Sequence, residues 1–203
     1  MPTGVALHDA RAQLFAAAER VLLRDGTGRL TSRAVTEEAG VAKGVLHRHF
    51  TDFDDFLAGF VRDRITGLDS ENAALIAAAG SATLVSNLAE MLARVFTPVN
   101  VGLVSVVLTR EELRSRLRSA SPGGIPILAE ASAGISAYLE GERSLGRLVE
   151  GADADKLAMA LVGTGHLLFA GELGALPDVS AVREIVEAII VGVEPGVGPR
   201  TNG

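Results

Sequence analysis

Residues 31–50 read TSRAVTEEAGVAKGVLHRHF, and this stretch decides the fold of the N-terminal part of the chain. Thr31 is a suitable N-cap for a short helix over residues 32–39, and Gly40 can take the positive φ of a tight turn. A second short helix is predicted over residues 42–50. The order of capped helix, glycine turn and short helix is typical of a helix-turn-helix. An αα-corner with a glycine turn would have most of the same signals, so this pattern alone leaves both open.

The second short helix separates apolar from basic side chains. At about 100° per residue, Leu46 and Phe50 share the inward side, whereas Gly44 and Arg48 project on the opposite side and Lys43 lies in the first turn. A recognition helix needs this division, with an apolar anchor behind and small or basic side chains toward base edges and phosphates. The helix is therefore a candidate for contact with double-stranded DNA.

The charge of the chain is unevenly distributed. The 203 residues have a net charge of −6, but residues 1–50 carry seven lysines and arginines against five acids, while residues 51–203 carry 12 against 20. This balance disfavours general coating of nucleic acid, yet a locally basic segment suits one localised contact with a polyanion. The run REELRSRLR at residues 110–118 alternates in sign and is interpreted as a solvated helix face.

The rest of the chain also has helical periodicity, and no long period-2 alternation predicts a strand, so the predicted fold class is all-α. Besides the two short helices, the predicted helices cover residues 9–24, a stretch from 52 or 53 into the alanine-rich 75–80, and residues 82–96, 99–118, 125–142, 153–173 and 178–193. Gly26 is the expected stop of the first helix, and Thr51 or Asp52 the expected cap of the fourth.

Several classes of protein are disfavoured by the sequence. There is no cysteine, no basic-then-apolar signal at the N-terminus, and no apolar run of about 20 residues, so we expect a cytoplasmic protein without a membrane segment. No nucleophile–base pair, P-loop, HExxH motif or dinucleotide fingerprint is present, so we expect no enzyme and no cofactor. His47 and His49 lie about 200° apart on a helix, so they do not chelate a metal, and no metal site is expected.

The chain resembles the TetR/AcrR-type helix-turn-helix transcriptional regulators over residues 11–60. The positions that carry the resemblance are Leu14, Ala17, Ala18, Leu22, Gly26, Thr31, Ala39, Gly40, Val41, Lys43, Gly44, Leu46, Arg48, His49, Phe50 and Leu57. The resemblance implies an N-terminal three-helix DNA-binding domain with a helix-turn-helix, residues 1–52, and a C-terminal helical ligand-binding and dimerisation domain, residues 53–195. Residues 196–203 are predicted to be a disordered tail.

The resemblance also implies the DNA-contacting residues. Lys43, Gly44 and Val45 are the candidates for base edges, and the candidates for phosphates are Thr31, Ser32, Arg33, His47, Arg48 and His49. His49 has an inward or capping role as an alternative, and Arg33 and Arg48 a merely solvated one. Three positions depart from the family, which usually has Thr at Val45, Tyr at His47 and Lys at Phe53. We therefore expect DNA binding with altered contacts.

Two further sites are expected in the C-terminal part. A cavity for a small apolar effector would be lined by Phe60, Leu88, Met91, Phe96, Leu103, Val107, Tyr138, His166 and Phe169. The resemblance implies a four-helix homodimer interface formed by the last two helices and their copies, with Leu161, Gly165, Leu168, Ile185 and Ile189 as candidates. Alternatively, these small and apolar residues form an intramolecular core, and His166 is a core histidine.

The sequence thus predicts a ligand-responsive DNA-binding regulator. The predicted mechanism is a homodimeric repressor that a small apolar effector releases from a palindromic operator. The alternative is a helical small-molecule sensor or interaction protein that has lost sequence-specific DNA binding, because of Val45, His47 and Phe53.

Overall fold

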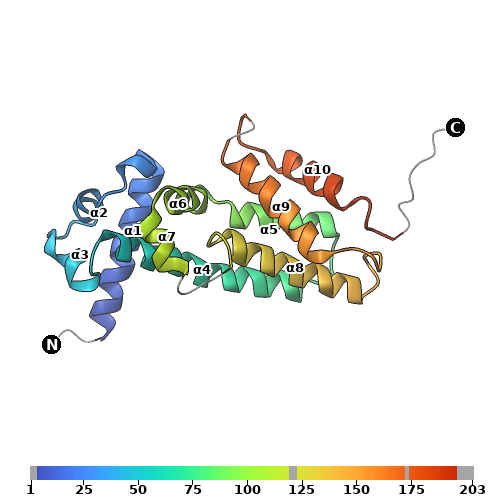
Figure 1. The fold of residues 1–203 in the computed structure, drawn as a ribbon, viewed down its shortest axis with the longest axis horizontal. Helices are drawn as coiled ribbons and strands as arrows, with labels where there is room; N and C mark the ends of the chain where they lie inside the picture. The colour runs from blue at the N-terminus through green and yellow to red at the C-terminus, as the bar shows by residue number, and fades with distance from the viewer. Residues whose placement is uncertain (1–3, 119–122, 172–173, 196–203) are drawn as a thin grey trace. The chain divides into compact units, whose positions relative to one another are not determined.

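The computed structural model describes residues 4–118, 123–171 and 174–195, with side chains from residue 10 onward, and every regular element in these residues is a helix (Figure 1). The all-α fold class is confirmed. The elements are α1 (Gly4–Asp25), the 3-10 helix η1 (Thr27–Arg29), α2 (Ser32–Glu38), α3 (Gly44–His49), α4 (Phe53–Ala77), α5 (Leu84–Val95), α6 (Pro98–Thr109), α7 (Glu111–Arg118), α8 (Leu128–Ser144), α9 (Ala154–Phe169) and α10 (Val179–Ile190).

The helices begin and end close to the predicted caps. Thr31 Oγ1 accepts a hydrogen bond from the Ala34 N–H at 3.2 Å and so caps α2. Gly26 follows the last residue of α1 with φ +78°, as a helix-terminating glycine does. Of the two candidate caps of α4, Asp52 has the role, because its Oδ1 accepts a hydrogen bond from the Asp55 N–H at 2.9 Å.

One predicted helix was wrong. The segment 99–118 forms two helices, α6 and α7, with the break at Arg110. Just before the break, the Thr109 hydroxyl donates to the Ser105 carbonyl at 3.0 Å, and Ser105 in turn donates to Val101. Hydroxyls that bond back to the preceding turn bend helices. The composition also changes here, because α6 contains no charged residue, whereas α7 is EELRSRLR.

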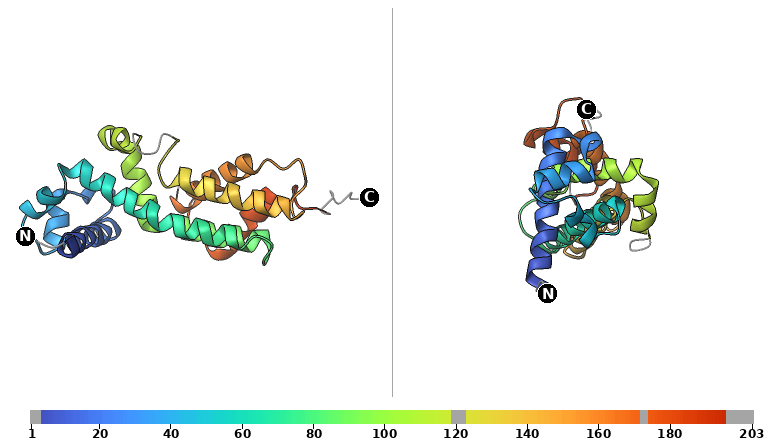
Figure 2. Two further views of the ribbon diagram at one scale, coloured as in Figure 1. Left: turned by 90° about the horizontal axis from the view of Figure 1, so that it is seen from below. Right: turned by 90° about the vertical axis from the view of Figure 1, so that its left-hand side faces the viewer.

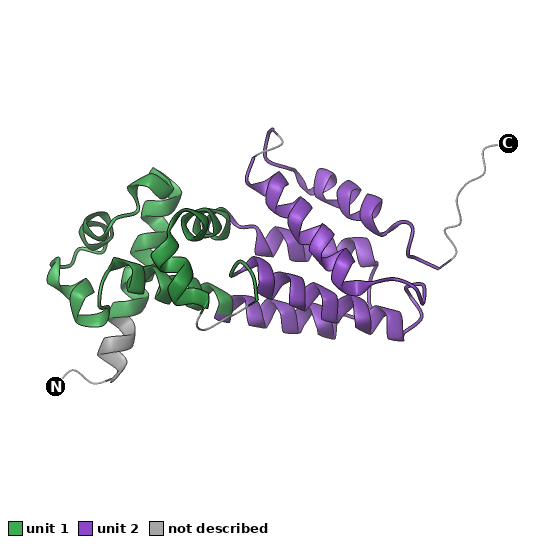
Figure 3. Ribbon diagram, viewed as in Figure 1, with its two compact units in different colours: residues 1–65, 98–126 green, residues 66–97, 127–203 purple. Residues whose placement is uncertain are grey.

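The chain divides into two compact units (Figure 3). Unit 1 comprises residues 1–65 and 98–126, and unit 2 comprises residues 66–97 and 127–203. One crossing between them lies inside α4, which Figure 2 shows as an unbroken helix in cyan to green. The predicted functional boundary between residues 52 and 53 stays a prediction, and the predicted tail, residues 196–203, lies outside the described residues.

Unit 1 has an aromatic core that joins α1 to the start of α4. Phe15 packs against Phe50, Phe56 and Phe60, with ring centroids 5.5 to 5.9 Å apart. The Phe50 ring lies edge-on to Phe56 at 5.2 Å. Because Phe50 directly follows α3, this cluster fixes the C-terminal end of that short helix against α1 and α4.

Unit 2 is a bundle in which α8 packs along α9 and α5 packs on α10 (Figure 1). A Cβ on Gly165 would lie 2.5 Å from the Phe96 ring, so only glycine permits this close approach of α9. Glu142 is fully buried, pairs with Arg147 at 3.2 Å and accepts a hydrogen bond from the Gly80 N–H. Desolvation and a hydrogen bond with Glu142 raise the pKa of the buried Tyr138.

Within the described residues, no single helix is long and apolar enough to cross a membrane, and only α5 and α6 meet that criterion, as a bent pair.

Candidate nucleic-acid interface

The helices α2 and α3 are joined by a turn that two backbone hydrogen bonds close. The Gly40 N–H donates to Glu37 O at 3.1 Å, and the Val41 N–H donates to Thr36 O at 3.0 Å. Gly40 has φ +67°, a conformation that side chains other than glycine adopt at a cost, as the sequence predicted. The turn therefore has one defined geometry, and it sets the direction of α3.

Helix α1 holds this motif from behind. The Gln13 side chain donates to the carbonyl of Ala39 in the turn at 2.9 Å. Arg20 and Arg24 both pair with Glu38 at the end of α2, at 2.7 and 2.6 Å, and their hydrogen bonds lower the pKa of the Glu38 carboxyl. These contacts fix α2, and through the turn they fix α3.

The two faces of α3 are those that the sequence predicted. Leu46 and Phe50 are buried, at 0% and 4% exposure. On the opposite side a Cβ at Gly44 would meet nothing within 4 Å, so a ligand could approach the backbone there. Of the remaining candidates on this segment, Lys43, His47 and Arg48 are exposed, and Val45 and His49 are half-buried.

The cations of this region differ in their partners. Arg20, Arg24 and Arg33 are paired with glutamates of the same domain, and the Arg11 guanidinium lies over the Phe50 ring. By contrast, neither Lys43 nor Arg48 forms an ion pair with any residue in the described part of the chain. Both charges on α3 and its first turn are therefore available to an external anion.

The predicted DNA-contacting residues at α2 make more contacts within the protein than those on α3. The Thr31 hydroxyl caps the helix, and Arg33 Nε contacts Glu37 at 2.7 Å in a pair whose side chains are 82% and 63% exposed. The Ser32 Oγ is buried and has no hydrogen-bond partner among the described residues. The nine predicted DNA-contacting residues thus gather on α2, the turn and α3, and their role stays a prediction.

Comparison with known proteins agrees with this geometry. Residues 14–58, which run from α1 into α4, match the family model described as "Bacterial regulatory proteins, tetR family". Residues 14–58 are thus similar to tetR-family regulatory proteins. The matched segment contains α2, the turn and α3, together with Phe15, Phe50 and Phe56 of the aromatic cluster behind them. No curated protein sequence matches the chain.

The solved structures extend the likeness over most of the chain. A TetR-family transcriptional regulator from Agrobacterium tumefaciens superposes with a TM-score of 0.69 at 15% identity, covering 93% of this chain and 99% of its own. SmeT, the repressor of the Stenotrophomonas maltophilia multidrug efflux pump SmeDEF, gives 0.64 at 21%, covering 93% and 92%. FadR from Bacillus subtilis, in complex with stearoyl-CoA, gives 0.65 at 18%, covering 90% and 99%. At these identities the likeness shows the fold, which is that of TetR-family regulators.

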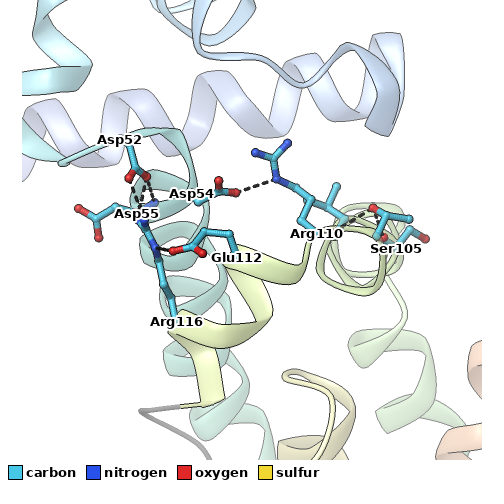
Figure 4. A network of polar contacts seen from close by, with 9 residues as sticks. Asp52, Asp54, Asp55, Ser105, Arg110, Glu112 and Arg116 are labelled. Carbon is cyan, nitrogen blue, oxygen red and sulfur yellow. Dashed lines mark hydrogen bonds and ion pairs between the residues drawn. The ribbon is translucent and has the colours of Figure 1, made fainter.

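Sequence reasoning missed a set of charges at the first turn of α4, next to α3 (Figure 4). Arg116 of α7 donates two hydrogen bonds to Asp52, at 2.7 and 2.8 Å, and Arg110 Nε donates one to Asp54 at 2.7 Å. The Arg116 hydrogen bonds and the Asp55 N–H lower the pKa of Asp52 to about 2. The interpretation of residues 110–118 as a solvated face was therefore wrong for these two arginines. Their partners lie 56 and 64 residues away, so no local pattern could reveal them.

The nine predicted ligand-lining residues are divided between the two units. Phe60, Leu103 and Val107 are buried in unit 1, and the other six belong to unit 2. In unit 2 the Phe96 ring lies 6.1 Å from His166 and 5.6 Å from Phe169. Leu88, Met91, Phe96 and Tyr138 are buried, while His166 and Phe169 are half-buried. The His166 Nδ1 is buried and has no hydrogen-bond partner among the described residues.

Two grooves in unit 2 each include just one of the nine predicted residues. One, of about 190 Å³, lies between α4 and α5, includes Met91 and is bordered by the Glu71–Arg94 pair at 2.8 Å. The other, of about 340 Å³, includes Phe169 and is lined by α5 and the start of α10. The residues of the larger groove are Ser86, Ala89, Glu90, Ala93, Phe169, Pro177, Asp178, Val179, Val182 and Arg183. The predicted set as a whole stays a prediction.

The five predicted interface residues lie on α9 and α10, and two are in the core of unit 2. Leu161 is 0% exposed and Gly165 is packed against Phe96, whereas Leu168, Ile185 and Ile189 are half-buried. The outward side of α9 has a different set, Met159 at 66% exposure, Gly163 with open space at its Cβ position, and Leu167 at 46%. These three are spaced by four residues and share one face of the helix.

Proposed function

We propose that the protein is a ligand-responsive transcriptional regulator that reads double-stranded DNA with α3. The observation that carries this proposal is the state of α3 and its N-cap: Lys43 and Arg48 have no ion-pair partner among the described residues, and Gly44 is open, while Leu46 and Phe50 are buried anchors on the other side. A helix of this kind fits the major groove, where small side chains allow close approach and cations meet phosphates or guanine edges.

The proposed DNA contacts follow from the position of each residue on α2, the turn and α3. Lys43, Gly44 and Val45, at the start of α3, would meet base edges, while His47 and Arg48 would meet phosphates together with Thr31, Ser32, Arg33 and His49. Arg33 must exchange Glu37 for a phosphate oxygen. Since that ion pair is highly exposed, it is weakly held and the exchange costs little.

We further propose a homodimer, which would place two copies of α3 in successive major grooves of a palindromic operator. The exposed face of α9 formed by Met159, Gly163 and Leu167 supports this, because apolar side chains around an open glycine permit a close helix–helix contact. Gly163→Arg should give a monomer in analytical ultracentrifugation. Gly151→Arg, at another glycine with open space, is the matched control, and a monomeric wild type would contradict the dimer.

A small apolar effector is proposed to bind in unit 2 and to release the DNA, which makes the protein a repressor acting in the cytoplasm. The Nδ1 of His166, which has no hydrogen-bond partner among the described residues, lies on a ring beside Phe96 and offers one polar contact. FadR, which shares the fold, was solved with stearoyl-CoA, and this supports an apolar ligand. Linkage requires that effector and DNA weaken one another equally, by about 5- to 150-fold.

The test is selection of bound duplexes from a random pool, followed by affinity measurement at several salt concentrations. The expected result is a palindrome whose half-sites are about one helical turn apart. Screening apolar compounds for release of that duplex then tests the effector. If no sequence is selected even at low salt, the DNA-binding proposal is wrong and the chain is a helical sensor, an outcome that Phe53 in place of the family's lysine would explain.

A further inference from the structure

The first turn of α4 is acidic at a position where a DNA-binding surface is expected to be basic. Asp52, Asp54 and Asp55 flank Phe53 directly after the segment of α3, whose Lys43 and Arg48 are proposed to meet DNA. Asp55 accepts a hydrogen bond from the Thr51 N–H at 2.9 Å, but the carboxylates of Asp52 and Asp54 point toward another helix. Unpaired carboxylates within about 10 Å of a phosphate would repel it at 0.1 M salt.

Two arginines neutralise these carboxylates. Arg116 pairs with Asp52 through both terminal nitrogens, and Arg110 pairs with Asp54 while its guanidinium lies 5.7 Å from the centre of the Phe53 ring (Figure 4). The Arg62 side chain of α4 also donates to the Arg116 carbonyl at 3.3 Å. The start of α4 is thus held by α7 and by Arg110, the residue that precedes α7.

We propose that Arg110 and Arg116 are positioning residues of the DNA-binding surface, which pair with Asp52 and Asp54 so that these carboxylates neither repel the phosphates nor release the first turn of α4. The proposal rests on the proposed DNA-binding function. The two arginines act through the aspartates and do not themselves meet DNA, and the acidic turn stays compatible with a nearby nucleic acid.

A purely structural role for these pairs is disfavoured by the packing of α7. Leu113 and Leu117 are 0% and 2% exposed, so apolar burial already fixes the helix in unit 1. Arg114 and Arg118 of the same helix both pair with Glu111, one turn or two away, and need no partner on α4. Of the four arginines in residues 110–118, only Arg110 and Arg116 pair with the aspartates at the start of α4 in the described part of the chain.

The experiment compares Arg116→Gln with Arg118→Gln in the full-length protein, with the duplex that wild type selects. Arg118 is the matched control, because it lies on the same helix and is bound at 3.0 Å to Glu111 of that helix. Arg116→Gln should weaken binding about tenfold, whereas Arg118→Gln should stay within about twofold of wild type. The loss from Arg116→Gln should shrink as the salt concentration rises, because salt screens the repulsion between Asp52 and the phosphates, whereas Arg118→Gln should keep the wild-type slope.

A rescue variant separates screening from structure. Asp52→Asn retains a good N-cap and removes the charge, so the double variant Asp52→Asn/Arg116→Gln should recover affinity to within about threefold of wild type. A loss without rescue would overturn the proposal in favour of a packing role or a direct phosphate contact.

The outcomes distinguish this inference from the function on which it rests. If wild type selects a palindrome and Arg116→Gln binds it equally well, the positioning role of the arginines is wrong, while the proposed DNA-binding function is retained. If wild type selects no duplex, both are wrong. If Arg116→Gln does not fold, the other pair carries the same test through Arg110→Gln and Asp54→Asn/Arg110→Gln.

Discussion

Two basic segments of unit 1 have the same net charge of +2, with histidine taken as neutral, and opposite electrostatic states. Residues 40–50 contain Lys43 and Arg48, and neither has an acidic partner in the described part of the chain. Residues 110–118 contain four arginines, and each of them is paired, with Asp52, Asp54, Glu111 or Glu112. The first segment offers its charge to a ligand, while the second uses its charge within the unit.

The difference shows that the number of basic side chains does not tell whether their charge is available to an external anion. Residues 110–118 contain more arginines than residues 40–50, yet all four are paired within the described part of the chain. Arg110 and Arg116 are paired with the first turn of α4, which follows α3.

The largest expected effect comes from the anchor beneath α3. Leu46→Ala removes a fully buried side chain and should lower the free energy of unfolding by about 2–5 kcal/mol, because transfer and cavity terms add. Thermal unfolding followed by circular dichroism measures it. Val45→Ala, at the half-buried neighbouring position, is the control. Equal effects from the two would mean that α3 is not anchored through Leu46.

Lys43→Ala should change which sequence is bound. Lys43 stands unpaired at the start of α3, beside the open Gly44, and its loss should weaken binding to the selected duplex about tenfold or more and relax preference at one base pair. Selection repeated with the variant measures this. A uniform loss over all sequences would reassign Lys43 to phosphate contact.

Arg48→Ala tests the comparison directly against Arg118→Ala. The unpaired Arg48 should lose about three- to tenfold in affinity for every duplex, with a salt slope lower by about one. The paired Arg118 should change neither. Titrations at three salt concentrations give both quantities. If Arg118→Ala lowers the slope as well, ion pairing within α7 does not exclude it from DNA contact.

The sequence predictions were confirmed where they rest on interactions between residues close in sequence, and they failed where contacts between distant residues decide the structure. The cap at Thr31, the positive φ of Gly40 and the inward pair of Leu46 and Phe50 are local features, and each was confirmed because propensity and periodicity act over a few residues. The break at Arg110 was missed, since the apolar and charged halves of 99–118 form one helical pattern until tertiary contacts bend it.

The missed part of the candidate site was long-range. Asp52 and Arg116 are 64 residues apart, and nothing in either segment indicates the other. On α9 the family resemblance implied an interface and the intramolecular core was left open; Leu161 and Gly165 are buried against their own unit, while Met159 and Leu167 are exposed. A helix that is apolar on several sides does not tell which side its own chain covers.

The smallest expected effect is the pH dependence of the pair at the start of α4. The folded-state pKa of Asp52, about 2, lies below its ordinary value of 3.8, so the ionised carboxylate stabilises the folded state. This stabilisation is fully present above about pH 4 and is lost as the pH falls toward 2. Asp52→Asn keeps the N-cap and lacks the charge, so it isolates this contribution.

Both side chains of the pair are partly exposed, at 46% and 29%, and solvent screening limits the effect. At pH 7, Asp52→Asn should therefore lower the unfolding midpoint by no more than ~3 °C. The difference should shrink below pH 4 and become small near pH 2, where the carboxyl of Asp52 is about half protonated in the folded protein. A difference as large at pH 2 as at pH 7 would mean that the substitution acts through packing or the cap. The paired charge of α7 would then have no measurable part in holding the turn beside α3.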